Sequence, residues 1–140
     1  MRKIAIVYWS GTGNTEAMAA AVAEGVQASG AEAVLETAAA FDVAALDAYD
    51  AVAFGCPSMG SEQLEESEFE PMFENCESKL SGKKIALFGS YGWGDGEWMR
   101  NWEERCVGDG ALMACEPVIC NDAPEGDTVV ELNALGAALA

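Results

Sequence analysis

The sequence predicts an α/β protein in which a parallel sheet of five strands lies between two layers of helices. Three short apolar runs, Ile4 to Trp9, Ala51 to Cys56 and Ile85 to Phe88, are nearly continuous, as in strands that are covered on both faces. Segments with helical spacing separate these runs, and strands that alternate with helices favour a parallel sheet. The 140 residues suffice for a single domain over 1–140, and no linker or repeat interrupts them.

Two weaker apolar runs, Ala33 to Leu35 and Val118 to Cys120, complete the five expected strands. Each of the three strong runs ends in small residues, at Ser10-Gly11, Pro57-Ser58 and Gly89-Ser90. In open parallel sheets, ligands bind beyond the carboxyl ends of the strands. The loops after the first, third and fourth strands are therefore the candidate binding loops.

Four segments carry apolar residues at helical spacing, namely residues 18–26, 69–76, 98–106 and 129–139. We expect Asp95 to cap the third of these helices, because a short acidic side chain is a favoured N-cap. In the last helix, Val130, Leu135 and Leu139 should form the apolar stripe, although Gly136 weakens that helix.

The charge balance excludes one class of function and favours another. Lys and Arg number 7 against 24 Asp and Glu, which gives a formal net charge of −17. Such a surface repels phosphate backbones, so we expect no nucleic-acid binding. The same field favours encounter with basic patches on other proteins, although it could also serve solubility alone.

The chain contains no histidine, which removes every Ser-His-Asp, Cys-His and His-metal arrangement. Its five cysteines form no Cys-x-x-Cys pair, so we expect no metal site, and mostly buried thiols in a reducing compartment. The first apolar run is too short for a signal peptide, and no window approaches a membrane span. We therefore expect a cytoplasmic monomer without membrane contact.

The segment Ser10-Gly11-Thr12-Gly13-Asn14-Thr15 follows the first strand and opens the first helix. Its glycines let the main chain curl, and N–H groups at the helix start converge on an anion. It lacks the lysine of a Walker loop, and Glu16 stands where the dinucleotide fingerprint needs its third glycine. We predict a phosphate monoester site with neutral donors only, the alternative being an ordinary strand-to-helix turn.

Met59 and Trp93 lie in glycine-containing loops at the same end of the expected sheet. Trp93 stands between Gly92 and Gly94, which cannot shield it, and an exposed tryptophan is costly unless a ligand covers it. We therefore predict that Trp93 stacks on a planar ligand. Met59 could instead fill a gap in the packing, and Trp9 could be a core residue at a strand end.

These loops resemble those of the flavodoxins, in particular the short-chain flavodoxins of anaerobic bacteria. The resembling segments are Tyr8 to Glu16, Gly55 to Glu62 and Phe88 to Gly96, and the resemblance covers essentially the whole chain, most weakly from Asn121 onward. It implies a flavodoxin-like three-layer α/β/α sandwich with strand order 2-1-3-4-5, for which flavodoxin is itself a standard example. It also implies non-covalently bound FMN at the switch between the first and third strands.

The resemblance further implies which residues bind FMN. Met59 and Trp93 would pack on opposite faces of the flavin ring, and Glu62 would accept a hydrogen bond from the flavin N3–H. The peptide after Gly60 would turn over when the flavin takes one electron. The complete expected set is Trp9, Ser10, Gly11, Thr12, Gly13, Asn14, Thr15, Ser58, Met59, Gly60, Ser61, Glu62, Ser90, Tyr91, Gly92, Trp93 and Gly94, with no catalytic residue among them.

By this resemblance the protein is a low-potential one-electron carrier that shuttles between the semiquinone and hydroquinone of FMN. The phosphate loop lacks cations, and five acids crowd near the second loop, namely Glu62, Glu65, Glu66, Glu68 and Glu70. Both features disfavour an anionic hydroquinone and therefore lower the potential. The implied partners are basic surfaces of redox enzymes, such as pyruvate–ferredoxin oxidoreductase, hydrogenase, ferredoxin reductase or nitrogenase systems.

Two other functions share this topology. An FMN-dependent quinone reductase-like enzyme is the main alternative, but the chain has no insertion that could build a substrate pocket. A response-regulator receiver needs a cluster of acids at strand ends, whereas the first strand here ends in Tyr8-Trp9 and the third in Cys56-Pro57.

Overall fold

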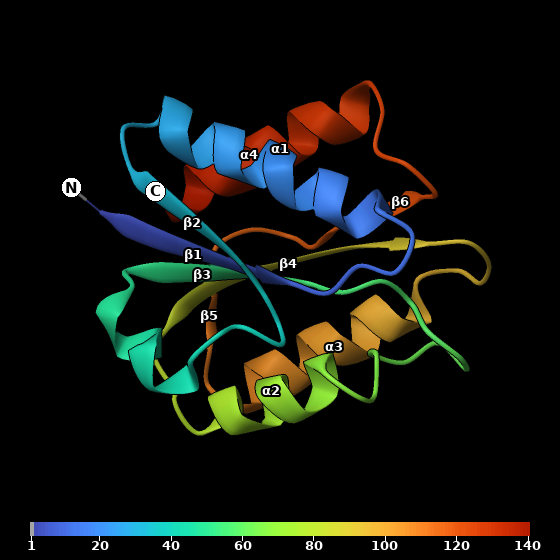
Figure 1. Ribbon diagram of the computed structural model, residues 1–140, viewed down its shortest axis with the longest axis horizontal. Helices are drawn as coiled ribbons and strands as arrows, with labels where there is room; N and C mark the ends of the chain where they lie inside the picture. The colour runs from blue at the N-terminus through green and yellow to red at the C-terminus, as the bar shows by residue number, and fades with distance from the viewer. Residues whose placement is uncertain (1) are drawn as a thin grey trace.

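The apolar runs form the inner strands of one parallel sheet in a computed structural model that describes residues 2–140 (Figure 1). The strands are β1 (Lys3–Tyr8), β2 (Glu32–Thr37), β3 (Ala51–Gly55), β4 (Lys84–Tyr91), β5 (Leu112–Met113) and β6 (Val118–Asn121). Their order is β2-β1-β3-β4-β5, β6 also pairs with β4, and every pairing is parallel. The expected sheet and strand order are confirmed, and the expected fifth strand corresponds to β6.

One edge of β4 is shared by two short strands. β5 pairs with Lys84 and Ile85, and β6 pairs with Phe88–Tyr91 further along. The interruption between them includes Pro117, which has no N–H to donate to a ladder. The sequence does not predict β5, because two residues carry no recognisable periodicity.

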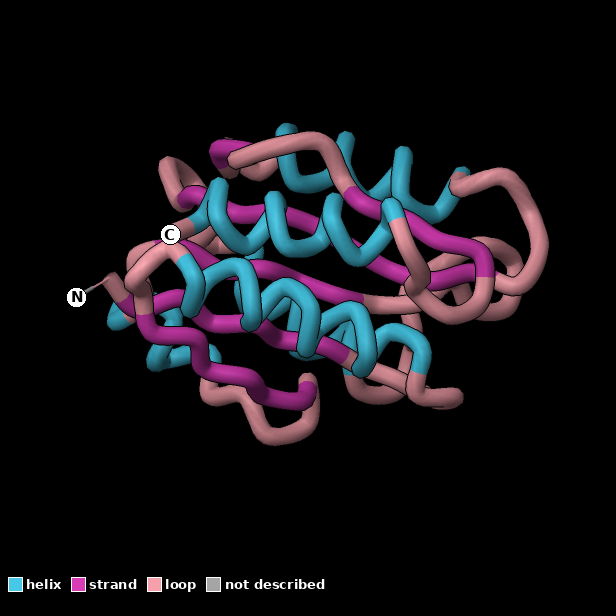
Figure 2. The backbone as a smooth tube through the Cα atoms, turned by 90° about the horizontal axis from the view of Figure 1, so that it is seen from above, coloured by secondary structure: helices cyan, strands magenta, loops and turns pink. Residues whose placement is uncertain are grey.

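Four α-helices cover the sheet, α1 and α4 on one face and α2 and α3 on the other (Figure 1). They are α1 (Asn14–Ala28), α2 (Phe69–Glu77), α3 (Glu97–Gly108) and α4 (Asp127–Leu139), and a short 3₁₀ helix, η1 (Val43–Ala48), precedes β3. Figure 2 shows the strands lying side by side in one layer, with loops gathered at their two ends. None of these helices, within residues 2–140, has the length and apolar character needed to cross a membrane.

The core is divided by the alternation of side chains along each inner strand. Ile4 and Ile6 pack on the α1 and α4 side, whereas Ala5 and Val7 pack on the α2 and α3 side. This explains why the strand sequences are continuously apolar, since both faces are buried. The α2 and α3 side contains an aromatic cluster in which Trp102 meets the ring of Phe69 edge-on, with centroids 5.4 Å apart.

Two details of the helices differ from expectation. Asp95 does not cap α3, because Gly96 precedes the helix with a left-handed φ of 90° and the Asp95 carboxylate pairs with Arg100 at 3.1 Å. Val130 is 68% exposed, because the buried stripe of α4 consists of Leu132, Leu135, Gly136 and Leu139, and Val130 lies outside that stripe.

Gly136 allows the close packing of α4 on α1. A Cβ at this position would lie 2.2 Å from the carbonyl oxygen of Val22 and 2.9 Å from the nitrogen of Val26. Nearby, the side-chain amide of Asn133 donates to the carbonyl of Ala21 over 2.9 Å. The glycine that lowers the helix propensity of α4 is therefore what lets the two helices approach.

Gly136→Ala should destabilise the protein by about 1 to 3 kcal/mol, because the added methyl group overpacks the contact with α1. Helix propensity alone predicts the opposite sign, a gain of up to about 1 kcal/mol. Gly108→Ala is the matched control, since Gly108 is also helical and a Cβ there meets nothing within 4 Å. Urea unfolding of both variants separates the two effects, and equal stability changes would contradict the packing role.

Glu65 is a buried acid that fixes the start of α2. Its carboxylate accepts main-chain hydrogen bonds from Ser67 at 2.8 Å, Glu68 at 2.7 Å and Phe69 at 2.9 Å, and another from the Ser67 hydroxyl. Burial by itself would raise the pKa of Glu65, but these hydrogen bonds outweigh it and lower the pKa to about 2. The ionised form therefore stabilises the folded state.

Glu65→Gln should lower the free energy of unfolding at pH 7 by about 2 to 3 kcal/mol. A carboxyl whose folded pKa is depressed contributes fully above its unfolded pKa, which is 4.5, and loses that contribution as the pH falls toward 2. The gap between wild type and variant should thus shrink by more than half at pH 3. The exposed neighbour Glu66 serves as control, since Glu66→Gln should change little at either pH; a gap independent of pH would refute the capping role.

Candidate functional site

The loops after β1, β3 and β4 meet at one edge of the sheet and enclose a cavity of about 220 Å³. Parallel strands bring their carboxyl ends to the same edge, so this convergence follows from the topology. The cavity is lined by Trp9, Gly11, Thr12, Asn14, Pro57, Ser58, Met59, Ser90, Tyr91, Gly92 and Asp122. Nine of these eleven residues belong to the set expected from the sequence.

The first loop is organised by the hydroxyl of Ser10. Ser10 Oγ accepts hydrogen bonds from the N–H of Gly13 at 3.1 Å and from that of Glu16 at 3.2 Å. Accepting these bonds leaves the hydroxyl proton free to donate to a ligand. Gly13 takes a left-handed φ of 96°, and α1 begins at the next residue, Asn14. The first N–H groups of the helix lack intrahelical partners and suit an anion.

Thr15 and Ser90 join the first and third loops. Thr15 is 1% exposed, and its hydroxyl lies 3.0 Å from that of Ser90, which is 5% exposed. The carbonyl of Ser90 also accepts from the N–H of Ser58, 3.0 Å away, which brings in the second loop. These three residues therefore fix the spacing of the three loops beside the cavity.

Trp9 lies between the central cavity and a neighbouring groove. The groove is lined by Tyr8, Trp9, Ser10, Gly11, Gly13, Glu16, Thr37, Ala39 and Glu68. The indole N–H of Trp9 donates to Glu68 over 2.9 Å, while its ring packs partly against the core. Trp9 therefore lies at the margin of the core and also lines both hollows, and its contact with a cofactor stays a prediction.

The second loop is a tight hairpin whose ends, Met59 and Gln63, exchange main-chain hydrogen bonds of 2.8 and 2.9 Å. Within it, Gly60 and Glu62 both have a left-handed φ of 53°. This conformation is free for glycine and mildly strained for a glutamate. Gly60 is exposed at the tip, so its peptide is accessible.

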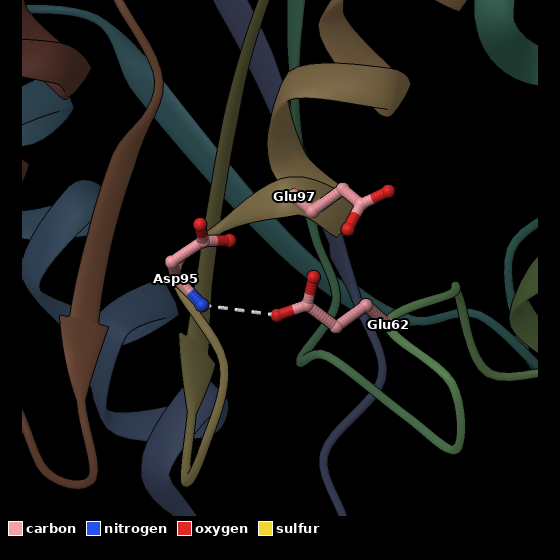
Figure 3. Close-up of side chains that lie close together, drawn as sticks. All are labelled: Glu62, Asp95 and Glu97. Carbon is pink, nitrogen blue, oxygen red and sulfur yellow. Dashed lines mark hydrogen bonds between the residues drawn. The ribbon is translucent and has the colours of Figure 1, made fainter.

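Trp93 lies outside the central cavity and is 61% exposed. It lines a shallow hollow of about 360 Å³ with Ser61, Glu62, Gly94, Asp95 and Glu97. Figure 3 shows three acidic side chains of this hollow together, and carboxylate oxygens of Glu62, Asp95 and Glu97 lie within 4.8 Å of one another. The two expected ring contacts, Met59 and Trp93, therefore line adjacent hollows.

Three residues of this region are missing from the expected cofactor-binding set. Pro57 and Asp122 line the cavity, and Glu68 bonds to Trp9. Asp122 directly follows β6 and has a left-handed φ of 60°, so the rule of carboxyl-end loops applies to it as well. Because the resemblance is weakest from Asn121 onward, it does not place Asp122 in the site. The contact between Trp9 and Glu68 joins residues 59 positions apart, so no local sequence pattern predicts it.

Two of the five acids expected near the second loop are held at α2, one by several N–H donors and one by a cation. Glu65 caps α2, as described above, and Glu70 forms an ion pair with Arg105 at 2.6 Å. Arg105 also pairs with Glu77 at 2.6 Å. Within residues 2–140, Glu62, Glu66 and Glu68 form no ion pair, so fewer of the five acids are paired with a cation than are left without one.

Cys56 lies directly after β3 but is buried, as are Cys76, Cys106 and Cys120. Burial raises the pKa of the Cys56 thiol, so this group stays protonated and unreactive. Its sulfur accepts a hydrogen bond from the N–H of Glu65 at 3.4 Å, which is a structural role.

The sequence is similar to known proteins whose family matches the fold described above. The model of the flavodoxin family matches residues 6–132. The chain is 50% identical to a flavodoxin of Clostridium beijerinckii over 120 residues, covering 86% of this chain and 87% of that one. It is 45% identical to a flavodoxin of Megasphaera elsdenii over 137 residues, covering 98% of each.

The fold is also similar to that of a solved flavodoxin. The solution structure of two-electron reduced Megasphaera elsdenii flavodoxin superposes with a TM-score of 0.90 at 46% identity, covering 97% of each chain. The described residues also suit FMN, because a loop rich in neutral donors adjoins an apolar cavity and an exposed indole. The chain therefore belongs to the flavodoxin family, whose members bind FMN and transfer electrons rather than act as enzymes.

Proposed function

We propose that this protein is a low-potential one-electron carrier that works as a cytoplasmic monomer and exchanges electrons with larger redox enzymes. The observation that carries the proposal is the convergence of three loops on one cavity whose lining contains neither Lys nor Arg. Bound FMN supplies the redox chemistry, and the protein binds it, orients it and sets its energetics.

Each loop would have a distinct task. The N–H groups at the start of α1, with the hydroxyls of Ser10 and Thr12, would bind the phosphate, and the Thr15–Ser90 pair would add a buried donor. Met59 and Trp93 would pack on the two faces of the flavin ring. Ser58, Ser61, Tyr91, Gly92 and Gly94 would complete the walls, and Gly60 would supply a peptide that can turn over.

The electrostatics of the site favour a low potential. No cation lines the cavity, so the phosphate charge stays uncompensated by the protein. One carboxylate about 10 Å from an added electron opposes it by roughly 1.7 kcal/mol at an effective dielectric of ~20, or about 70 mV. We propose that the protein cycles between the singly reduced and the fully reduced flavin, since these charges resist the second electron most.

Most of the positively charged residues lie at the end of the molecule opposite the candidate site. Arg2, Lys3, Lys79, Lys83 and Lys84 precede or begin strands and lie at the amino-terminal edge of the sheet, far from the site. Arg105 is bound by two glutamates, which leaves Arg100 as the one cation beside the binding loops in residues 2–140. The resulting dipole would turn the cofactor end toward basic surfaces of partner enzymes.

The purified protein should bind FMN with one-to-one stoichiometry, and anaerobic titration should show reduction in two resolved one-electron steps. Trp93→Ala should weaken FMN binding by about 10-fold to 100-fold, because it removes the stacked indole. It should also raise the potential of the second step, since the electron-rich indole face disfavours a negative flavin. Fluorescence titration measures the dissociation constant, and spectra recorded against mediator dyes give the potentials.

Trp93→Phe is the matched control, because it keeps an aromatic face and should lose much less affinity. An unchanged second potential in Trp93→Ala would contradict the stacking role. A folded protein without affinity for FMN would refute the proposed function as a whole.

Electron transfer from the reduced protein to a basic one-electron acceptor, cytochrome c, should slow by roughly 10-fold or more between 10 and 300 mM salt. At low salt, Glu66→Gln near the site should lower the rate by about 2-fold. Glu24→Gln removes the same charge in the later part of α1, away from the site, and should have a smaller effect. Stopped-flow kinetics test both points, and equal effects of the two variants would argue against oriented docking.

A further inference from the structure

The second and third binding loops are joined by a contact between Glu62 and the main chain of Asp95. Glu62 Oε1 accepts a hydrogen bond from the Asp95 N–H over 3.1 Å, as the dashed line in Figure 3 shows. Hydrogen bonds to an ionised acceptor are stronger than neutral ones. Because one loop carries Met59 and the other carries Trp93, this contact constrains the distance between the two expected ring contacts.

Gly94 makes the contact sterically possible. A Cβ at position 94 would lie 1.7 Å from Glu62 Oε1 and 2.7 Å from the carboxylate carbon. Gly94 also has a left-handed φ of 89°, which most other residues avoid. The carboxylate thus occupies the space that any side chain at residue 94 would take.

Arg100 holds the other side of the contact. Its guanidinium donates from Nη1 to the Asp95 carbonyl at 3.0 Å and from Nη2 to Asp95 Oδ1 at 3.1 Å. Arg100 lies on α3, so it ties the loop that contains Trp93 to a regular element. The N–H of Asp95 is therefore presented to Glu62 from a supported segment, whereas Glu62 itself lies on a strained hairpin.

We propose that Glu62, Gly94 and the Asp95 N–H form a latch that sets the width of the flavin-ring slot. Glu62 Oε1 is engaged by Asp95, and Oε2, to which no donor within residues 2–140 is bonded, stays available to a donor on the ligand. Gly94 is then a positioning residue that acts through Glu62. The proposal rests on the proposed FMN site and names which interaction between loops prepares it.

A double-mutant cycle tests the latch. Gly94→Ala should raise the dissociation constant for FMN by about 10-fold or more, because the methyl group displaces the carboxylate. Gly82→Ala is the matched control, since Gly82 has a φ of 75°, a Cβ there meets nothing within 4 Å, and it lies away from the site. It should change the dissociation constant by less than about 2-fold.

In a Glu62→Ala background, Gly94→Ala should cost no more than the control substitution, because no carboxylate remains to be displaced. In a Glu62→Gln background it should stay harmful, because the glutamine occupies the same space. Independent, multiplicative effects of the Glu62 and Gly94 substitutions would overturn the latch.

Hydrogen exchange of the Asp95 amide provides a readout that needs no cofactor. In the FMN-free full-length protein, this amide should exchange about 10-fold faster in Glu62→Ala than in wild type, and Glu62→Gln should preserve the protection. Unchanged exchange in Glu62→Ala would refute the latch even if Gly94→Ala failed to fold. Intact protection in a protein that does not bind FMN would instead refute the proposed function and leave the latch standing.

Discussion

The site depends on the parallel pairing of β3 with β4, which continues past the last residue of β3. The N–H of Cys56 donates to the Phe88 carbonyl at 3.1 Å, and that of Ser58 donates to the Ser90 carbonyl at 3.0 Å. The main chains approach so closely that a Cβ on Gly89 would lie 2.2 Å from the Cys56 oxygen. The Cys56 oxygen accepts a hydrogen bond from the indole N–H of Trp98 at 3.1 Å, so α3 contacts the main chain at the same position. The second and third binding loops therefore start from one rigid platform.

Much of this arrangement could be predicted from sequence because burial on both faces leaves a continuous apolar signature in the inner strands. The positions of the candidate binding loops could be predicted for a related reason, since small residues directly follow each of these strands, where the carboxyl ends of parallel strands meet. Val130 and Asp95 were misassigned because several helical phases and several turn geometries fit the same residues, and tertiary packing decides among them. Asp122 also follows the carboxyl end of a strand, but the short strand β6 is only weakly predicted from sequence. The contact of Trp9 with Glu68 exists only once β1 and α2 have docked.

The acidic residues divide into those that stabilise the fold and those that lie at the candidate site. Glu65 is surrounded by N–H donors at the start of α2, and Glu70 and Glu77 share Arg105 between α2 and α3. These carboxylates are compensated locally and add little to the potential at the cavity. Among residues 2–140, neither Glu62 nor Asp122 forms an ion pair, and both lie in or beside the cavity. A count of acids along the sequence therefore overstates the uncompensated charge at the candidate site, because hydrogen bonds and ion pairs already hold some of these carboxylates.

Rigidity is distributed unevenly between the two ends of the site. At the end proposed to bind the phosphate, the buried hydroxyls of Thr15 and Ser90 and the two bonds to Ser10 hold the first loop. At the end proposed to bind the flavin ring, Gly60 and Trp93 are exposed. The proposed one-electron carrier would use both properties, because it must keep its cofactor during encounters while the ring environment adjusts to each redox state. In the proposed function, the contacts of Ser10, Thr15 and Ser90 would retain the cofactor, and the loops linked through Glu62 and Asp95 would respond to its redox state.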